Sequence, residues 1–233
     1  MADPISIVFP LYSDMTHLDF TGPHQVLARL PGARLTVASI GGEPVKADGL
    51  TFSGLARLED IEACDVVCVP GGVGCGRMMT DEAFLAAIRR LAVGARYVTS
   101  VCTGSLILGA AGLLEGRRAA CHWAWRDFLP LFGAVPDAGR VVRDGDVITG
   151  GGVTAGIDFS LTLATELAGA DVAQSIQLML EYAPSPPFDA GRPDTAPAEI
   201  YAKVAAVSGV NAPGRRAEIE GAGAAYAAKR AAA

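Results

Sequence analysis

The chain has 233 residues, of which 19 are Lys or Arg and 25 are Asp or Glu, so its net charge is −6. Hydrophobic residues make up 51% and charged residues 19% of the sequence, which is typical of a globular protein with a large core and excludes a disordered chain. The acidic balance argues against nucleic-acid binding, no apolar run approaches the ~20 residues of a membrane span, and the first residues lack the features of a secretory signal.

Segments typical of strands alternate along the chain with segments typical of helices. Short runs rich in β-branched residues predict strands, at 5–9, 35–40, 65–70 and 97–101. Apolar residues at helical spacing predict helices, at 21–30, 80–91, 105–114, 155–167 and 172–182. Turn residues predict hairpin strands, at 44–58 and around Asp144-Gly145. Buried strands separated by helices predict an α/β fold with a mostly parallel sheet, helices on both faces and a small antiparallel hairpin.

The composition changes at Pro184, where prolines become frequent and are followed by a Gly- and Ala-rich stretch. We therefore predict a main domain at 1–183 and a Pro/Ala/Gly-rich C-terminal extension at 184–233. One short helix is expected in the extension, at 198–207. The rest of the extension is expected to fray, as chain ends commonly do.

The five cysteines are an odd number in a chain of medium length: Cys64, Cys68, Cys75, Cys102 and Cys121. They imply no disulfide framework and favour a reducing, cytoplasmic environment. Cys68 lies in an apolar run and is predicted to be a core residue, so we expect no zinc site.

Cys102 is the candidate nucleophile because it lies where a predicted strand meets a predicted helix. Ser100 and Gly104, two residues before and after it, are small, as a tight strand-to-helix turn requires. At such a turn the thiol projects above the sheet edge, next to unpaired N–H groups and the positive end of the helix dipole. We therefore expect a lowered thiol pKa and a nucleophilic Cys102; the alternative is a buried, inert cysteine.

A second loop, Pro70-Gly71-Gly72-Val73, ends another central strand. In open parallel sheets, ligands bind beyond the C-terminal ends of the strands, where Cys102 is also expected. The backbone N–H groups of Gly72 and Val73 are therefore candidates for substrate binding. The alternative is a simple turn.

Asp19 follows the first strand and precedes a predicted helix. It is either the N-cap of that helix or a buried carboxylic acid near Cys102 whose pKa is raised, so that it passes a proton. His122 is the candidate base for a Cys–His pair. Its alternative role is that of a histidine at a strand end with structural hydrogen bonds.

Several motifs taken together resemble the ThiJ/PfpI superfamily of class I glutamine-amidotransferase-like folds. They lie within about residues 5–183 and follow in order: Leu18-Asp-Phe-Thr-Gly-Pro, Val69-Pro-Gly-Gly, Val101-Cys-Thr-Gly, Cys121-His-Trp and Gly151-Gly-Val-Thr-Ala-Gly-Ile-Asp. The resemblance implies a flavodoxin-like three-layer fold. Protease-like members carry a histidine directly after the nucleophilic cysteine, so Thr103 weakens a peptidase interpretation.

Within the superfamily, the sequence is most similar to the isonitrile hydratases. This similarity implies hydration of an isonitrile to an N-substituted formamide without a cofactor. Cys102 would then attack the substrate to form a thioimidate, Asp19 would be its acidic partner, and Asp19 and Thr103 would orient the water. The resemblance also implies a homodimer.

Two other classes of function stay open. Regulators resembling the AraC type carry the same fold ahead of a helix-turn-helix module, and a sensor built from this sequence would lack the basic charge of such a module. A deglycase-like or redox-responsive protein would use Cys102 to attack carbonyls or to become oxidised.

Overall fold

The computed structural model describes residues 4–212 and 214–232, and within these ranges seven strands form one sheet in the order β10-β11-β7-β6-β1-β2-β5. Their bounds are β1 (Ile5–Pro10), β2 (Ala33–Ser39), β5 (Ala56–Arg57), β6 (Val66–Val69), β7 (Tyr97–Val101), β10 (Val141–Asp144) and β11 (Val147–Gly150). Neighbouring strands are parallel except for β10 and β11, which form an antiparallel pair at one edge. The predicted mostly parallel α/β sheet is confirmed.

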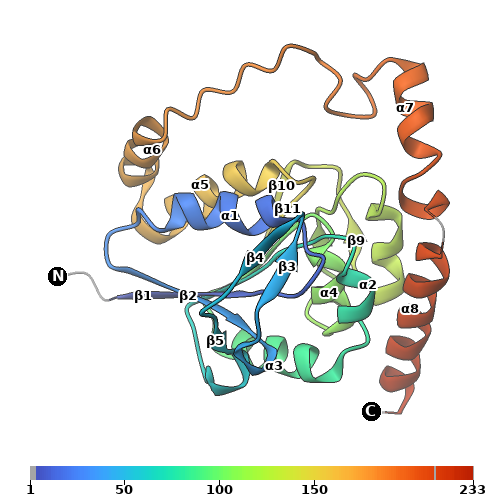
Figure 1. Ribbon diagram of the computed structural model, residues 1–233, viewed down its shortest axis with the longest axis horizontal. Helices are drawn as coiled ribbons and strands as arrows, with labels where there is room; N and C mark the ends of the chain where they lie inside the picture. The colour runs from blue at the N-terminus through green and yellow to red at the C-terminus, as the bar shows by residue number, and fades with distance from the viewer. Residues whose placement is uncertain (1–3, 213, 233) are drawn as a thin grey trace.

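Helices cover both faces of this sheet (Figure 1). Three of them pack together on one face: α1 (His17–Leu27), α5 (Ala155–Ala168) and α6 (Ala170–Met179). Three more lie on the other face: α2 (Cys75–Met78), α3 (Glu82–Ala92) and α4 (Gly104–Ala110). This is the three-layer arrangement that the sequence predicts, and it explains why the central strands are apolar on both sides.

β6 illustrates the double burial of the central strands. All four of its residues are buried, and Cys68 among them has no exposed surface. The prediction that Cys68 is a core residue is therefore confirmed.

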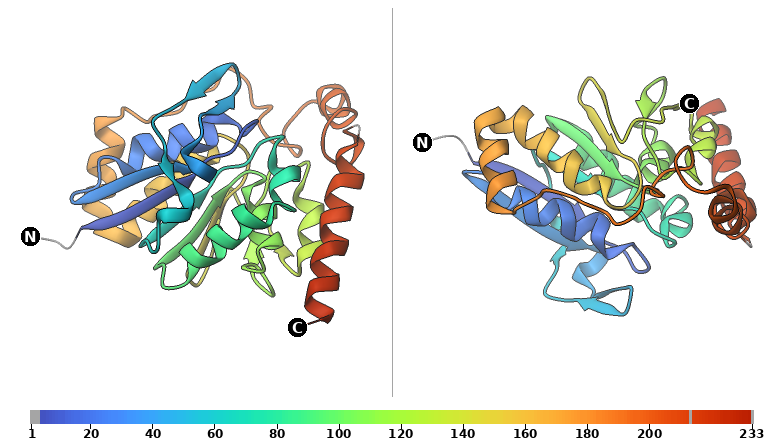
Figure 2. Two further views of the ribbon diagram at one scale, coloured as in Figure 1. Left: turned by 60° about the horizontal axis from the view of Figure 1, so that its bottom comes forward. Right: turned by 90° about the horizontal axis from the view of Figure 1, so that it is seen from above.

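Short strands and 3-10 turns supplement the three layers. β3 (Val45–Ala47) and β4 (Leu50–Phe52) form an antiparallel hairpin that projects from the body (Figure 2). β8 (Arg118–Ala119) and β9 (Val135–Pro136) form a short parallel pair. Four 3-10 turns complete the described connections: η1 (Ile40–Gly42), η2 (Leu58–Asp60), η3 (Arg126–Phe132) and η4 (Gly209–Asn211).

Helix α1 begins at His17, four residues before its predicted start. A tertiary contact accounts for the difference, because the carboxylate of Asp48 accepts a hydrogen bond from the His17 N–H at 2.9 Å. Asp48 lies in the turn between β3 and β4 and thereby satisfies one of the free N–H groups at the helix start. Asp19 consequently lies in the first turn of α1, and its interpretation as an N-cap is wrong.

The C-terminal extension differs most from expectation. It contains the predicted short helix, α7 (Ala198–Ala205), but also α8 (Arg215–Ala231), where fraying was predicted. The Gly- and Ala-rich sequence of α8 gives a weak helical signal, and tertiary packing stabilises the helix because Ile219 and Ala222 are buried. Figures 1 and 2 show α8 along the side of the molecule where the parallel strands end. No helix in the described ranges is long and apolar enough to cross a membrane.

Candidate active site

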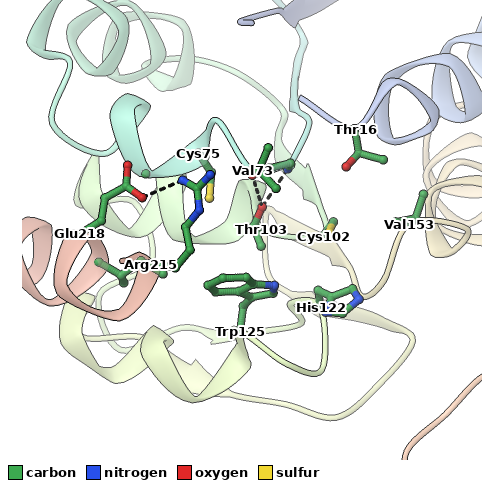
Figure 3. A pocket seen from close by; sticks show the side chains of 13 residues that line it. Thr16, Val73, Cys75, Cys102, Thr103, His122, Trp125, Val153, Arg215 and Glu218 are labelled. Carbon is green, nitrogen blue, oxygen red and sulfur yellow. Dashed lines mark hydrogen bonds and ion pairs between the residues drawn. The ribbon is translucent and has the colours of Figure 1, made fainter. Parts of the chain in front are cut away.

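The loops that follow four parallel strands meet at one edge of the sheet and line a cavity of about 140 Å³ (Figure 3). The contributing residues lie after β1, β6, β7 and β11: Thr16, Gly72, Val73, Cys102, Thr103 and Val153. The remaining wall comes from α2, from the loop after β8 and from α8: Cys75, Gly76, His122, Trp125, Arg215, Glu218 and Ile219. The cavity therefore lies at the C-terminal edge of the sheet, as the sequence predicts for an open parallel sheet.

Cys102 lies in a sharp turn between β7 and α4. Its φ is 59°, in the left-handed region that residues with a side chain rarely occupy. The turn is fixed to β11 because the Cys102 N–H donates to the carbonyls of Gly150 (3.0 Å) and Gly151 (2.8 Å). A side chain at Gly104 would overlap the carbonyl of Val69, which explains the small residue there. A strained backbone of this kind commonly marks a functional residue.

The carboxyl group of Asp19 lies fully buried beneath this turn. Its Oδ2 accepts a hydrogen bond from the Gly71 N–H at 2.9 Å, and its Oδ1 makes no hydrogen bond to any of the described residues. Only glycine fits at position 71, because a Cβ there would lie 2.5 Å from the Thr103 nitrogen. The structure thus brings Asp19 next to Cys102, as the sequence argument requires.

Burial dominates the electrostatics of this pair. It raises the pKa of Asp19 to about 7, although the Gly71 N–H and the Cys102 thiol both lower it. Burial, followed by the negative charge of Asp19, raises the pKa of the Cys102 thiol well above its ordinary value. The N–H of Thr103 acts in the opposite direction but is outweighed. The expectation of a lowered thiol pKa is therefore wrong, and the resting site holds a neutral thiol beside a carboxyl group that titrates near neutrality.

Thr103 fixes the neighbouring loop rather than pointing freely into the cavity. Its hydroxyl accepts a hydrogen bond from the Gly72 N–H at 2.9 Å and lies 3.2 Å from the Gly72 carbonyl, to which it donates. The Gly72 N–H is thereby occupied and is not free for a substrate. A hydroxyl has two acceptor lone pairs, so that one remains for a further donor. Val73 lies at the mouth of the cavity and is 60% exposed.

Replacing Thr103 by Val should destabilise the loop that carries Gly72. The change leaves the buried N–H of Gly72 without its acceptor, which costs about 1–3 kcal/mol. Urea-induced unfolding would measure this loss. Thr103→Ser retains the hydroxyl and should lose less than half as much; equal losses in the two variants would contradict a role for the hydrogen bonds.

His122 lines the cavity but is not paired with Cys102. Its Nδ1 accepts a hydrogen bond from the Ala124 N–H at 3.2 Å, and burial lowers its pKa. The ring is therefore neutral, with its proton on Nε2. Within the described ranges no hydrogen bond joins His122 to the Cys102 thiol, so the local geometry offers no Cys–His dyad.

Trp125 and the first turn of α8 are parts of the site that the sequence argument missed. Trp125 follows the Cys121-His-Trp motif by only two residues, so its closeness to a quoted motif was an available signal. The residues of α8 carried no such signal, because nothing local in the extension indicates which surface it covers. Within the described ranges, no group of three or more His, Cys, Asp or Glu side chains is arranged to hold a metal ion.

The structure belongs to a class of α/β proteins with a cysteine-centred site at the sheet edge. Its defining features are the parallel sheet, the strained Cys102 at a strand–helix junction and the adjoining buried carboxyl group. The model of the DJ-1/PfpI family matches residues 5–166, most of the main domain. The chain belongs to the DJ-1/PfpI family.

Individual relatives extend this match. The isonitrile hydratase of Pseudomonas putida is 55% identical over 197 residues, which cover 84% of this chain and 86% of that protein. The crystal structure of a ThiJ/PfpI family protein from Pseudomonas syringae is 40% identical, with a TM-score of 0.90 over 96% of this chain and 91% of that one. The transcriptional regulator CdhR of Pseudomonas aeruginosa is 30% identical over 73% of this chain, which spans 52% of the regulator.

Proposed function

We propose that the chain is an isonitrile hydratase, which adds water to an isonitrile and releases an N-substituted formamide. The observation that carries this proposal is the buried pair of Cys102 and Asp19 at a small cavity, in a chain 55% identical to the Pseudomonas putida isonitrile hydratase. The other lining side chains, such as Trp125, Val153 and Ile219, are largely apolar and suit an uncharged substrate.

The chemistry of an isonitrile fits a paired thiol and carboxyl group. The terminal carbon of R–N≡C must gain a proton and a nucleophile at the same atom, and no leaving group is expelled. Sulfur is a suitable nucleophile for this carbon. A carboxyl group that titrates near neutrality is well matched to proton transfer in both directions.

In the first stage the Cys102 sulfur forms a bond to the isonitrile carbon. The thiol proton passes to the Asp19 carboxylate, and Asp19 delivers a proton to the same carbon. The product is the thioimidate R–N=CH–S–Cys102, which contains all atoms of the thiol and the isonitrile. Because the resting thiol is protonated, sulfur need not be ionised before the substrate arrives.

In the second stage a water molecule attacks the thioimidate carbon. Asp19 accepts a proton from this water, and the free acceptor lone pair of Thr103 orients it. Asp19 passes this proton to the nitrogen, the C–S bond breaks as the remaining hydroxyl proton passes to sulfur, and the products are R–NH–CHO and the Cys102 thiol. The Nε2–H of His122 is a further candidate to donate a hydrogen bond in this stage. The scheme uses no cofactor.

Cys102 differs from a redox sensor in its exposure. Sensor cysteines are solvent-accessible, whereas Cys102 is 5% exposed. The five cysteines are free thiols, which supports our expectation of a cytoplasmic location. The homodimer remains an expectation from the family resemblance.

Turnover of two substrates in parallel tests the proposal. Purified protein should convert an alkyl isonitrile to the corresponding formamide, which chromatography with mass detection would quantify. Methylglyoxal serves as the comparison substrate, because a deglycase-like enzyme would consume it. Consumption of methylglyoxal with no loss of the isonitrile would reject the proposal in favour of carbonyl chemistry, and consumption of neither would reject both.

A further inference from the structure

The C-terminal helix α8 forms part of the wall of the catalytic cavity. Arg215, Glu218 and Ile219 line the cavity and lie in the first two turns of this helix. The residues matched by the family model end at position 166, so this wall is an addition to the common core of the family. The part of the cavity that it forms can therefore differ between members that share the same reacting residues.

Close packing holds α8 in place. A side chain at Gly76 would overlap the Glu218 carboxylate, so α8 lies directly on the backbone of α2. A side chain at Gly223 would lie 2.9 Å from Leu131 Cβ, so α8 also packs closely on η3. At the far end of the helix, Tyr226 donates a hydrogen bond to Glu115 at 2.5 Å. The helix is thus a fixed wall and not a loose tail.

The wall of α8 lies at the end of the cavity away from the reacting sulfur. In the view of Figure 3, Cys102 and His122 lie to the right of Trp125, and Arg215 and Glu218 lie to its left. The Arg215 and Glu218 side chains form an ion pair at 2.7 Å, with both side chains 30% exposed. Ile219 follows Glu218 in α8, is 1% exposed and also lines the cavity. A substrate substituent that leaves the sulfur along Trp125 therefore reaches α8.

The size of the cavity sets how much of a substituent it encloses. A cavity of about 150 Å³ holds one benzene molecule, which has about six non-hydrogen atoms, and this cavity measures about 140 Å³. Besides the carbon and nitrogen of an isonitrile it therefore encloses about four further atoms. The ion pair at this end is internally neutralised, so it offers no free charge to a charged substituent.

We infer that Ile219 and the Arg215–Glu218 ion pair bound the part of the cavity that encloses the substituent, about four non-hydrogen atoms of an uncharged group, and thereby set how kcat/KM depends on substituent length. This inference rests on the proposed hydratase function. Ile219 is a specificity-determining residue in this scheme and takes no part in proton transfer or bond formation.

A ladder of linear alkyl isonitriles, from propyl to octyl, tests the inference through kcat/KM. In the wild type, kcat/KM should no longer rise with chain length once the chain exceeds about four carbon atoms. Ile219→Ala removes three carbon atoms from the wall and should raise the hexyl-to-propyl ratio of kcat/KM about tenfold or more, since one methylene in a pocket changes discrimination by at least that factor. Ile219→Val should shift the ratio in the same direction by a smaller factor.

Ile176→Ala is the matched control, because Ile176 is equally buried but lies in α6, away from the cavity. It should lose similar stability and keep the wild-type ratio. An unchanged ratio in both Ile219 variants, with turnover intact, would overturn the role of α8 alone. Failure of the wild type on every isonitrile of the ladder would overturn the proposed function and the inference together. Near-UV circular dichroism of each variant verifies folding, and Ile219→Val supplies the ratio should Ile219→Ala not fold.

Discussion

Replacing Cys102 by Ala should lower formamide production by at least about 10⁴-fold, the scale of loss seen when a covalent nucleophile is removed. In the proposed scheme sulfur forms the bond that lets water attack the isonitrile carbon, and no other described side chain in the cavity combines a thiol with the Asp19 carboxyl group. A rapid-quench experiment on the wild type should detect the protein with the added mass of one intact isonitrile. Peptide mapping should place this mass on Cys102.

Cys64→Ala is the control for this experiment. Cys64 is also a buried free thiol, but its Sγ contacts the Leu91 carbonyl at 3.8 Å and it does not line the cavity. This variant should keep both turnover and the adduct. Retained turnover in Cys102→Ala, or an adduct on another cysteine, would exclude the thioimidate route.

The position of Cys102 could be predicted from the sequence because it depends on local chemistry. A strand, a tight turn and a helix impose small residues at fixed distances, and Gly104 shows that requirement directly. The convergence of Cys102, Gly72 and Asp19 follows from a topological rule, since parallel strands end at the same edge of the sheet. Local spacing and strand order are therefore sufficient to predict most of the fold and the centre of the site.

Burial and long-range packing could not be predicted in the same way. The turn around Cys102 supplies an N–H that lowers the thiol pKa, but the structure shows that burial and Asp19 outweigh it. How deeply a thiol lies depends on everything packed over it. In this chain the surroundings of the thiol include Asp19, which is more than 80 residues away from Cys102 in the sequence. The direction in which the pKa of the Cys102 thiol changes therefore depends on tertiary packing.

The raised pKa of Cys102 and the pKa of Asp19 near neutrality are compatible with both stages of the proposed reaction. The first stage needs one proton in the site, held either by the thiol or by Asp19. A thiol with a raised pKa keeps the proton in the site until sulfur begins to form its bond. Asp19, with a pKa of about 7, can then accept that proton and release it again at little cost.

Replacing Asp19 by Asn should abolish proton transfer while making the folded protein more stable at alkaline pH. Asn keeps the shape and the acceptor for the Gly71 N–H but cannot carry the proton, so we expect kcat to fall by about 10²–10⁴-fold. The pKa of Asp19 rises from 3.8 in the unfolded chain to about 7 in the folded one. The folded state therefore binds the proton more tightly, and the stability of the wild type decreases as pH rises from about 4 to 7.

This destabilisation is absent from Asp19→Asn and amounts to at most roughly 4 kcal/mol in the wild type. Urea-induced unfolding at pH 4 should give similar free energies for the two proteins, whereas at pH 8 the variant should be the more stable. Asp158→Asn is the matched control, because Asp158 lies outside the cavity and forms an ion pair with Arg140, and its replacement should give no gain at pH 8.

The contrary result would be an Asp19→Asn variant that is inactive but whose stability relative to the wild type is the same at pH 8 as at pH 4. It would mean that Asp19 is ionised in the folded protein at low cost. The carboxyl group would then be a fixed charge beside the sulfur instead of a proton carrier, and the proton for the isonitrile carbon would have to come from the thiol directly.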